Sequence, residues 1–206
     1  MGNILTAKVR IVGVKPMLHH RFGPDALPLE KKERSGVAGN DPEEFRKTVS
    51  VTRDGQLFID ATYAFAVIRE GARNTKRGRG SIQSNVIATL QIVDSIILID
   101  RYWPGFPNGQ AFDIATADPP TRDPEAPVYL DVRGVVNPST KGRNVRYRAA
   151  CSPGWSCEFS ILWDKTIVSR NEMEASVIDG GRLSGIGSGR KIGMGRFEVA
   201  SFEVAE

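Results

Sequence analysis

Cysteine and histidine are both scarce in this sequence, with two residues of each. Two cysteines exclude a structural zinc site of the four-cysteine type. Cys151 and Cys157 are separated by a Pro-Gly turn, and we expect them to be reduced, partly buried thiols. From these residues we expect neither a bound metal nor a cofactor.

Long apolar runs are missing as well. No stretch reaches the roughly 18 apolar residues that a membrane-spanning helix needs. The first residues also lack the apolar segment and the small-residue cleavage site of a secretory signal. We therefore expect no membrane contact and a cytoplasmic location.

Length and charge set the next limits. A chain of 206 residues with 40% hydrophobic content can form one sizeable core, so we expect a single domain over residues 1–206 with insertions. Lys and Arg (28) outnumber Asp and Glu (24) by only four. Because this excess is small, the clustering of the basic residues says more about partners than their number does.

Alternation of polar and apolar residues predicts most of the strands, and an apolar, β-branched run predicts the strand at 96–99. Arg53-Asp54-Gly55 predicts a hairpin turn, since Asp-Gly favours the tight turn between two paired strands. Asp60 or Thr62 can cap a helix that runs to Ala72, and Ser169 or Asn171 can cap a second helix, Glu172–Asp179. The predicted strands are 8–14, 48–51, 56–59, 96–99, 128–133, 145–148, 155–163 and 197–204.

The order of these elements predicts the fold. Strand, helix, strand, strand, helix, strand is the order of an α+β, ferredoxin-like (RRM-like) domain, an antiparallel sheet with helices on one face. Two stretches, 21–48 and 102–127, are polar and proline-rich and show no periodicity. We expect them to be irregular insertions.

A glycine-rich basic loop, residues 180–196, is the most informative segment. Its seven glycines allow positive φ and close backbone approach, and its four basic residues have no acidic residue beside them. This combination suits a phosphate backbone better than a plain turn. A nucleotide-binding motif needs a strand before the glycines and a helix after them, and this segment has the reverse order.

The loop also carries a spaced motif. Gly185-Ile186-Gly187 is followed by five residues and then by Gly193-Met194-Gly195-Arg196-Phe197. This pattern resembles the C-terminal glycine loop of the repeat-associated mysterious protein (RAMP) superfamily, the ferredoxin-like RNA-binding backbone subunits of CRISPR effector complexes and their phage-encoded relatives. The resemblance implies single-stranded RNA, or single-stranded DNA, as ligand. It also implies partners: further copies of the chain along the strand, and other effector-complex subunits.

Two further basic clusters support a binding groove, although each alone fits a solvated charged face equally well. In the subunits that this chain resembles, the helix after an early strand and the glycine loop flank the RNA. Tyr147 adds an aromatic face on which a base can stack. The predicted nucleic-acid-binding residues are Arg73, Lys76, Arg77, Arg79, Lys141, Arg143, Arg146, Tyr147, Arg148, Arg182, Gly185, Gly187, Arg190, Lys191, Gly193, Gly195 and Arg196.

Other aromatic residues leave alternatives open. Trp155, with Phe159 and Trp163 on the same predicted strand, either stacks on bases or belongs to the core, and the core is favoured for Trp155. Tyr102 and Trp103 lie in the second insertion. They could form a projecting tip that wedges between bases or contacts a neighbouring subunit.

The histidines provide the only route to a metal-independent nuclease. His19 and His20 follow the first strand, where relatives that process CRISPR RNA place a general acid or base. No sequence feature locates a catalytic partner for them. We therefore predict a non-catalytic subunit. The alternatives are a metal-independent endoribonuclease that uses His19 or His20, and a phage single-stranded DNA-binding or structural protein.

Overall fold

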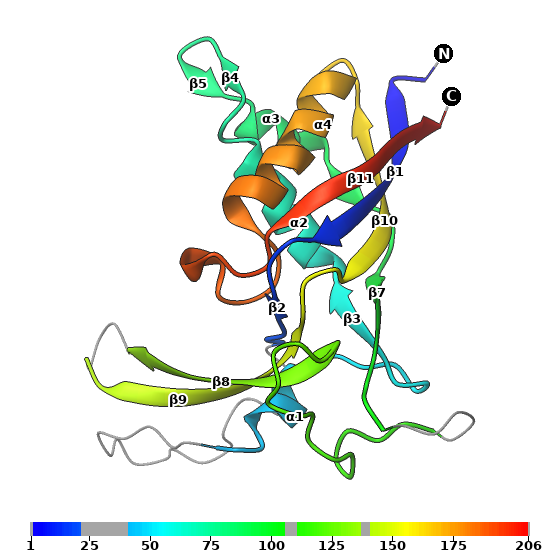
Figure 1. The fold of residues 1–206 in the computed structure, drawn as a ribbon. Helices are drawn as coiled ribbons and strands as arrows, with labels where there is room; N and C mark the ends of the chain where they lie inside the picture. Colours follow the sequence, from blue (N-terminus) through cyan, green and yellow to red (C-terminus); the bar gives the residue numbers. More distant parts are fainter. Residues whose placement is uncertain (1, 22–40, 106–110, 137–140, 206) are drawn as a thin grey trace, which may run out of the picture. The chain divides into compact units, whose positions relative to one another are not determined.

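The computed structural model describes residues 2–21, 41–105, 111–136 and 141–205 (Figure 1). The chain divides into two compact units. Unit 1 comprises Met1–Met17, Phe58–Asp100 and Pro153–Glu206, and unit 2 comprises Leu18–Leu57 and Arg101–Ser152. The described parts of both predicted insertions fall in unit 2.

The main sheet has the strand order β11-β1-β10-β7-β3, with β6 also paired to β10. β1 pairs antiparallel with both β10 and β11, so that Val9 lies opposite Phe159 and Phe202. This arrangement confirms the α+β prediction of an antiparallel sheet with few helices. The strands are β1 (Ile4–Gly13), β3 (Gln56–Asp60), β6 (Gln91–Ile92), β7 (Ile96–Tyr102), β10 (Ser156–Asp164) and β11 (Phe197–Ala205).

Two helices, α2 (Ala61–Gly71) and α4 (Arg170–Asp179), lie side by side against one face of this sheet (Figure 1). The Asp60 carboxylate accepts the Thr62 N–H at 2.8 Å and caps α2, as predicted. Ser169 caps α4 in a reciprocal capping box with Glu172. A Cβ on Gly71 would lie 1.9 Å from the Ser176 carbonyl oxygen, so the two helices pack backbone to backbone.

The core of unit 1 lies between this face and the helices. Val9 and Ile11 of β1 are fully buried, as are Val67 and Ile68 of α2 and Trp163 of β10. Their regular alternation along the strands is the pattern from which the strands were predicted. Because α2 and α4 pack so closely here, the segment that follows α4 emerges beside α2.

Unit 2 contains a sheet of order β2-β9-β8, formed by β2 (Met17–Leu18), β8 (Val128–Val136) and β9 (Arg143–Cys151). A short helix, α1 (Glu44–Thr48), packs against β9. Residues 21–48 were predicted to be irregular, and α1 corrects this prediction. The reason is tertiary, because Phe45 of α1 is fully buried and stacks on Trp103 at 5.8 Å.

The segment after α2, for which no element was predicted, forms a hairpin, β4 (Lys76–Arg77) and β5 (Gly80–Ser81), and a helix, α3 (Gln83–Thr89). Two further local predictions need correction. Of the predicted strand 48–51, only Val51 is paired, in a single bridge to Leu57. Trp103 was placed on a projecting tip, but it is buried and its indole N–H donates to the Asp118 carbonyl. Within the described ranges no helix is long and apolar enough to cross a membrane.

Candidate nucleic-acid interface

A backbone hydrogen bond joins the two ends of the glycine loop, and we call this closed base of the loop its neck. Ile186 donates its N–H to the Gly195 carbonyl at 2.9 Å, and Gly195 donates to the Pro16 carbonyl at 2.7 Å. Gly185 and Gly195 both have positive φ, and a Cβ on Gly195 would lie 1.7 Å from the Ile186 carbonyl oxygen. The two Gly-hydrophobic-Gly segments therefore form the two arms of the neck, and the fold alone already requires glycine at positions 185 and 195.

The tip of the loop is a single 3₁₀ turn, Arg190–Ile192. Gly189 and Gly193 bound it with φ values of 73° and 86°, and the Met194 N–H donates to the Gly189 carbonyl at 3.2 Å. This turn exposes Lys191, whereas Arg190 is half-buried. Of the other predicted contacts, Arg182 is exposed, Arg196 is half-buried and Gly187 is buried with a φ of 80°.

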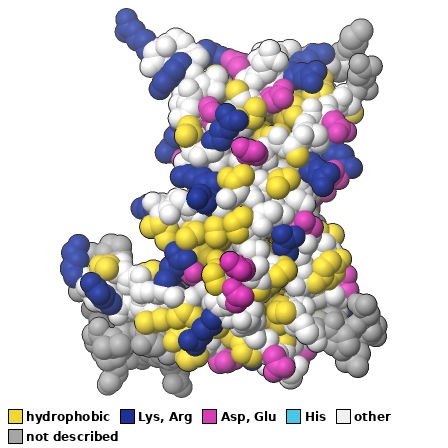
Figure 2. Space-filling model, in the orientation of Figure 1, with side chains coloured by type: hydrophobic (Ala, Val, Ile, Leu, Met, Phe, Trp, Pro, Cys, Tyr) yellow, Lys and Arg dark blue, Asp and Glu magenta, His cyan; other side chains and the backbone are white. Residues whose placement is uncertain are grey.

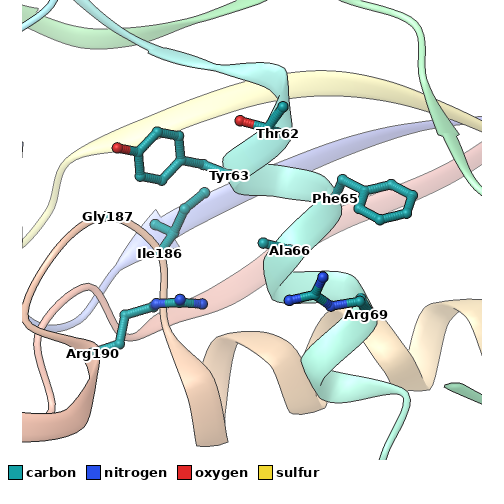
Figure 3. A pocket seen from close by; sticks show the side chains of 8 residues that line it. All are labelled: Thr62, Tyr63, Phe65, Ala66, Arg69, Ile186, Gly187 and Arg190. Carbon is teal, nitrogen blue, oxygen red and sulfur yellow. The ribbon is translucent and has the colours of Figure 1, made fainter. Parts of the chain in front are cut away.

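A recess of about 350 Å³ lies between the loop and α2 (Figure 3). In Figure 3 the side chains of Arg69 and Arg190 extend toward each other from opposite walls, and the Tyr63 ring projects from α2 over the loop. Burial raises the pKa of Tyr63, and Arg190 opposes this shift. The recess is lined by Thr62, Tyr63, Phe65, Ala66, Arg69, Ile186, Gly187 and Arg190.

The basic cluster after α2 is partly neutralised. Glu70 pairs with Arg69 at 3.1 Å and with Arg73 at 2.8 Å. Arg77 binds both oxygens of Glu172 and donates to the Ile167 carbonyl, so it fastens the β4–β5 hairpin to the start of α4. This structural role was not predicted for Arg77.

Two other basic residues of the β4–β5 hairpin have surroundings that differ from those of Arg77. Lys76 and Arg79 are exposed and form no salt bridge in the part of the chain that the structure describes. Lys and Arg atoms gather at the upper left of Figure 2, where the β4–β5 hairpin lies in Figure 1. Within this cluster, Lys76 and Arg79 are therefore the best placed to attract a polyanion.

The third cluster lies on and before β9, in unit 2. Lys141 and Arg143 are exposed, and Arg146 pairs with Glu44 of α1 at 2.8 Å. Burial, with Arg146 and Arg133 nearby, lowers the pKa of Arg148. Tyr147 is half-buried. The structure thus brings the glycine loop together with α2 in unit 1, and assigns the β9 cluster to the other unit.

The tryptophans belong to the core. Trp155 and Trp163 are fully buried, and Phe159 is 2% exposed. The indole N–H of Trp155 donates to the Lys15 carbonyl at 2.9 Å, and that of Trp163 donates to the Val168 carbonyl at 2.9 Å. The core interpretation is therefore confirmed for Trp155, and base stacking by these three side chains is wrong. Tyr102 remains 56% exposed.

The two histidines differ in their surroundings. His19 is buried, its Nε2 lies 3.6 Å from the Cys151 sulfur, and burial lowers its pKa to about 4. His20 is half-buried and lies near Glu44 and the β9 arginines; burial, Arg148 and Arg146 together lower its pKa. Cys151 and Cys157 are both buried and form no disulfide within the described residues. Among the described residues, no group of three His, Cys, Asp or Glu side chains could hold a metal ion.

Sequence reasoning missed part of the recess. Tyr63 and Thr62 were treated only as residues of a helix, and neither was proposed as a ligand contact. Both residues line the recess because α2 lies beside the glycine loop. The spacing from the Asp60 cap could have indicated that both residues lie in the first turn of α2, but not what faces that turn.

Comparisons with known proteins show that the fold is similar to that of chains in solved structures. No protein-family model and no curated protein matches the sequence. A chain in the cryo-EM structure of the type III-B Cmr-beta bound to cognate target RNA is similar, with a TM-score of 0.50 at 12% identity over 98% of this chain. This chain spans 61% of the length of that one. A chain of a type IV-B CRISPR complex aligns with a TM-score of 0.43 at 13% identity, over 97% of this chain and 90% of the other.

Proposed function

We propose that this chain is a non-catalytic subunit that binds single-stranded nucleic acid, with RNA favoured over DNA. The observation that carries the proposal is the recess between α2 and the glycine loop, where two guanidinium groups and a tyrosine ring converge. Two guanidinium groups that extend into one recess offer several N–H donors to a phosphate placed between them. The recess therefore suits an anion in contact with an aromatic face.

The chemistry of the recess fits one unit of an unpaired strand. Arg190 and Arg69 can contact phosphate oxygens, and Tyr63 offers a ring on which a base can stack without regard to sequence. Around the recess, Arg182 and Lys191 are exposed and can extend the contacts along the backbone. A duplex would keep its bases paired and away from Tyr63, so a single strand is the better ligand.

The fold supports the same proposal. β11-β1-β10-β7 is the strand order of a ferredoxin-like sheet, with α2 between β1 and β7 in sequence and α4 between β10 and β11. We infer a ferredoxin-like core of the RAMP type. The solved structure bound to target RNA shares this fold at low identity, which favours RNA and other effector-complex subunits as partners. Such a role would be cytoplasmic.

We further propose that several copies lie side by side along one strand. Insertions 21–48 and 102–127 are long for plain connections, and a neighbouring copy offers a surface for them. Residues 22–40 and 106–110 lie outside the described residues. Single-strand binders commonly coat their ligand cooperatively.

Tyr63 gives the first test. Tyr63→Ala is expected to weaken binding of a single-stranded oligonucleotide by about tenfold, because base stacking on an aromatic ring contributes about 1–3 kcal/mol. Tyr63→Phe keeps the ring and should bind as the wild type does. Fluorescence anisotropy with a labelled RNA and the matching DNA measures both variants and shows which nucleic acid is preferred. Equal binding by the alanine variant would remove Tyr63 from the interface.

The endoribonuclease alternative rests on His20, because His20 is half-buried among charged groups whereas His19 is enclosed beside Cys151. We expect RNA incubated with the protein in EDTA to remain intact. His20→Ala should not change this result. EDTA-resistant cutting that disappears in His20→Ala would establish the nuclease instead.

The remaining alternative is a phage structural protein of the same fold. It predicts no salt-dependent strand binding and no nucleic acid that copurifies with the protein. Treating copurified material with RNase and DNase separates this alternative from an RNA-binding or a DNA-binding subunit.

A further inference from the structure

Glu44, the first residue of α1, lies in an unusual place for a carboxylate. Its side chain is only 12% exposed. Oε1 accepts a hydrogen bond from Nη1 of Arg146 at 2.8 Å, and Oε2 accepts one from the backbone N–H of Tyr147 at 2.9 Å. Both oxygens of Glu44 are thus held by two consecutive residues of β9.

The edge of β9 explains why a backbone donor is available there. β8 pairs with β9 along one edge, from Val128 opposite Cys151 to Val136 opposite Arg143. On the other edge β2 and the residue after it reach only the end of the strand, where His19 donates its N–H to the Ala149 carbonyl at 2.9 Å. Two residues earlier, no strand among the described residues lies beside the N–H of Tyr147, and Glu44 supplies the acceptor.

The surroundings of Glu44 are those of an anion site. Arg146 and Arg148 are two residues apart on β9 and therefore point to the same face, and both act electrostatically on His20 together with Glu44. The guanidinium of Arg146 is not saturated, because its Nε is buried and has no hydrogen-bond partner among the described residues. A backbone N–H, two guanidinium groups and an imidazole surround one carboxylate.

We propose that Glu44 is an internal stand-in for a phosphate, and that a phosphodiester of the bound single strand displaces it from Arg146 and the Tyr147 N–H. This inference rests on the proposed function, since it assumes that the chain binds a strand. A phosphodiester presents two charged oxygens in the same way as a carboxylate and can accept the same two hydrogen bonds. The ligand continues along β9 to Arg143 and Lys141, which are exposed.

Displacement has a consequence for α1. Glu44 begins this helix, and its two hydrogen bonds attach that end of α1 to β9. A phosphate in the site leaves α1 held by Phe45, which is buried against Trp103, and by Arg46, which donates to the Ile114 and Ala117 carbonyls. In the free protein Glu44 occupies the β9 donors that a strand phosphate would use. A strand must therefore displace Glu44 in order to bind there.

If Glu44 instead has a structural role, its replacement changes the affinity for the strand in the opposite direction. If Glu44 serves to align Arg146 for a ligand, its loss weakens binding. If it competes with the ligand, its loss strengthens binding. Glu44→Gln separates the two cases, because glutamine keeps the size and one acceptor oxygen of glutamate but removes the charge.

The experiment uses the full-length protein, a labelled single-stranded RNA and a titration of salt. Glu44→Gln is expected to bind about threefold more tightly than the wild type, the scale of one partly exposed ion pair. The plot of log K against log salt should keep the slope of the wild type, because the strand phosphate contacts Arg146 in both proteins. Glu43→Gln is the matched control, because Glu43 precedes Glu44, has the same charge and pairs with Arg46 instead. It should leave affinity and slope unchanged.

Arg146→Ala gives an independent readout that does not require Glu44→Gln to fold. If a strand phosphate contacts Arg146, the slope of log K against log salt is shallower for this variant than for the wild type by about 0.7. An unchanged slope in Arg146→Ala, or unchanged or weaker binding by a folded Glu44→Gln, overturns the inference while the strand binding of the wild type stands. A wild type that binds no strand overturns the proposed function and this inference together.

Discussion

Gly195→Ala is expected to lower the free energy of unfolding by about 3 kcal/mol or more. Gly195 has a φ of 69°, in the region that costs a residue with a side chain about 1–2 kcal/mol. A Cβ there would also lie 1.7 Å from the Ile186 carbonyl oxygen, which is backbone and must shift. Overpacking of this kind costs a further 1–3 kcal/mol or so. Urea unfolding followed by tryptophan fluorescence measures the change.

Gly193→Ala is the matched control for Gly195→Ala. Gly193 has a φ of 86°, but a Cβ there would meet nothing within 4 Å. The substitution therefore incurs the backbone cost alone, about 1–2 kcal/mol. Equal destabilisation by the two alanines would show that the neck of the loop does not close through Ile186 and Gly195.

The double replacement Arg190→Ala with Lys191→Ala is expected to weaken single-strand binding by about 100-fold. Each side chain at the tip of the loop can make a charged hydrogen bond to phosphate, worth about 1.5–3 kcal/mol. Arg190 also lines the recess opposite α2, whereas Lys191 is exposed and lies outside the recess. Because phosphate contacts carry no base information, the loss should be the same for every sequence. Anisotropy with several oligonucleotides measures it.

A control variant that loses the same two positive charges elsewhere shows whether the loss of strand affinity is specific to the glycine loop. Lys165 and Arg170 are exposed, belong to unit 1 and lie outside the recess. Replacing both with alanine should reduce affinity only slightly, through the lower net charge. A reduction as large as that of the loop variant would mean that the protein attracts the strand by its overall charge.

Local signals in the sequence located most of unit 1. Alternation indicated β1 and β11, and an apolar, β-branched run indicated β7. The prediction also placed a strand at β10, and the caps at Asp60 and Ser169 indicated where α2 and α4 begin. These elements follow from hydrogen bonds and side-chain patterns within a few residues of one another. Such signals do not depend on what packs nearby.

The missed elements depend on contacts that are distant in sequence. α1 begins where Glu44 reaches β9, about a hundred residues away, and Trp103 is buried because Phe45 stacks on it. Arg77 looked like a ligand contact, because only the fold brings Glu172 beside it. In the same way, no pattern in α2 indicates that Tyr63 faces the glycine loop.

The glycine motif was predicted as a ligand contact, and its neck has a second explanation. Gly185 and Gly195 are required by the close approach of the two arms, whether or not a strand binds. Gly193 is not explained by a close approach of this kind, because a Cβ there would meet nothing within 4 Å. Contact of Gly187 and Gly193 with nucleic acid stays a prediction. The basic residues that the neck positions are therefore a better test of binding than the glycines are.

The salt dependence of strand binding by the wild type and by the Arg190→Ala, Lys191→Ala variant tests the central claim most directly. Each phosphate contact releases counterions, so log K falls with log salt at about 0.7 per contact on a single strand. If the glycine loop beside α2 binds the strand, the slope of the variant is shallower than that of the wild type by about 1.4. A slope that does not change when both side chains are removed would contradict the account.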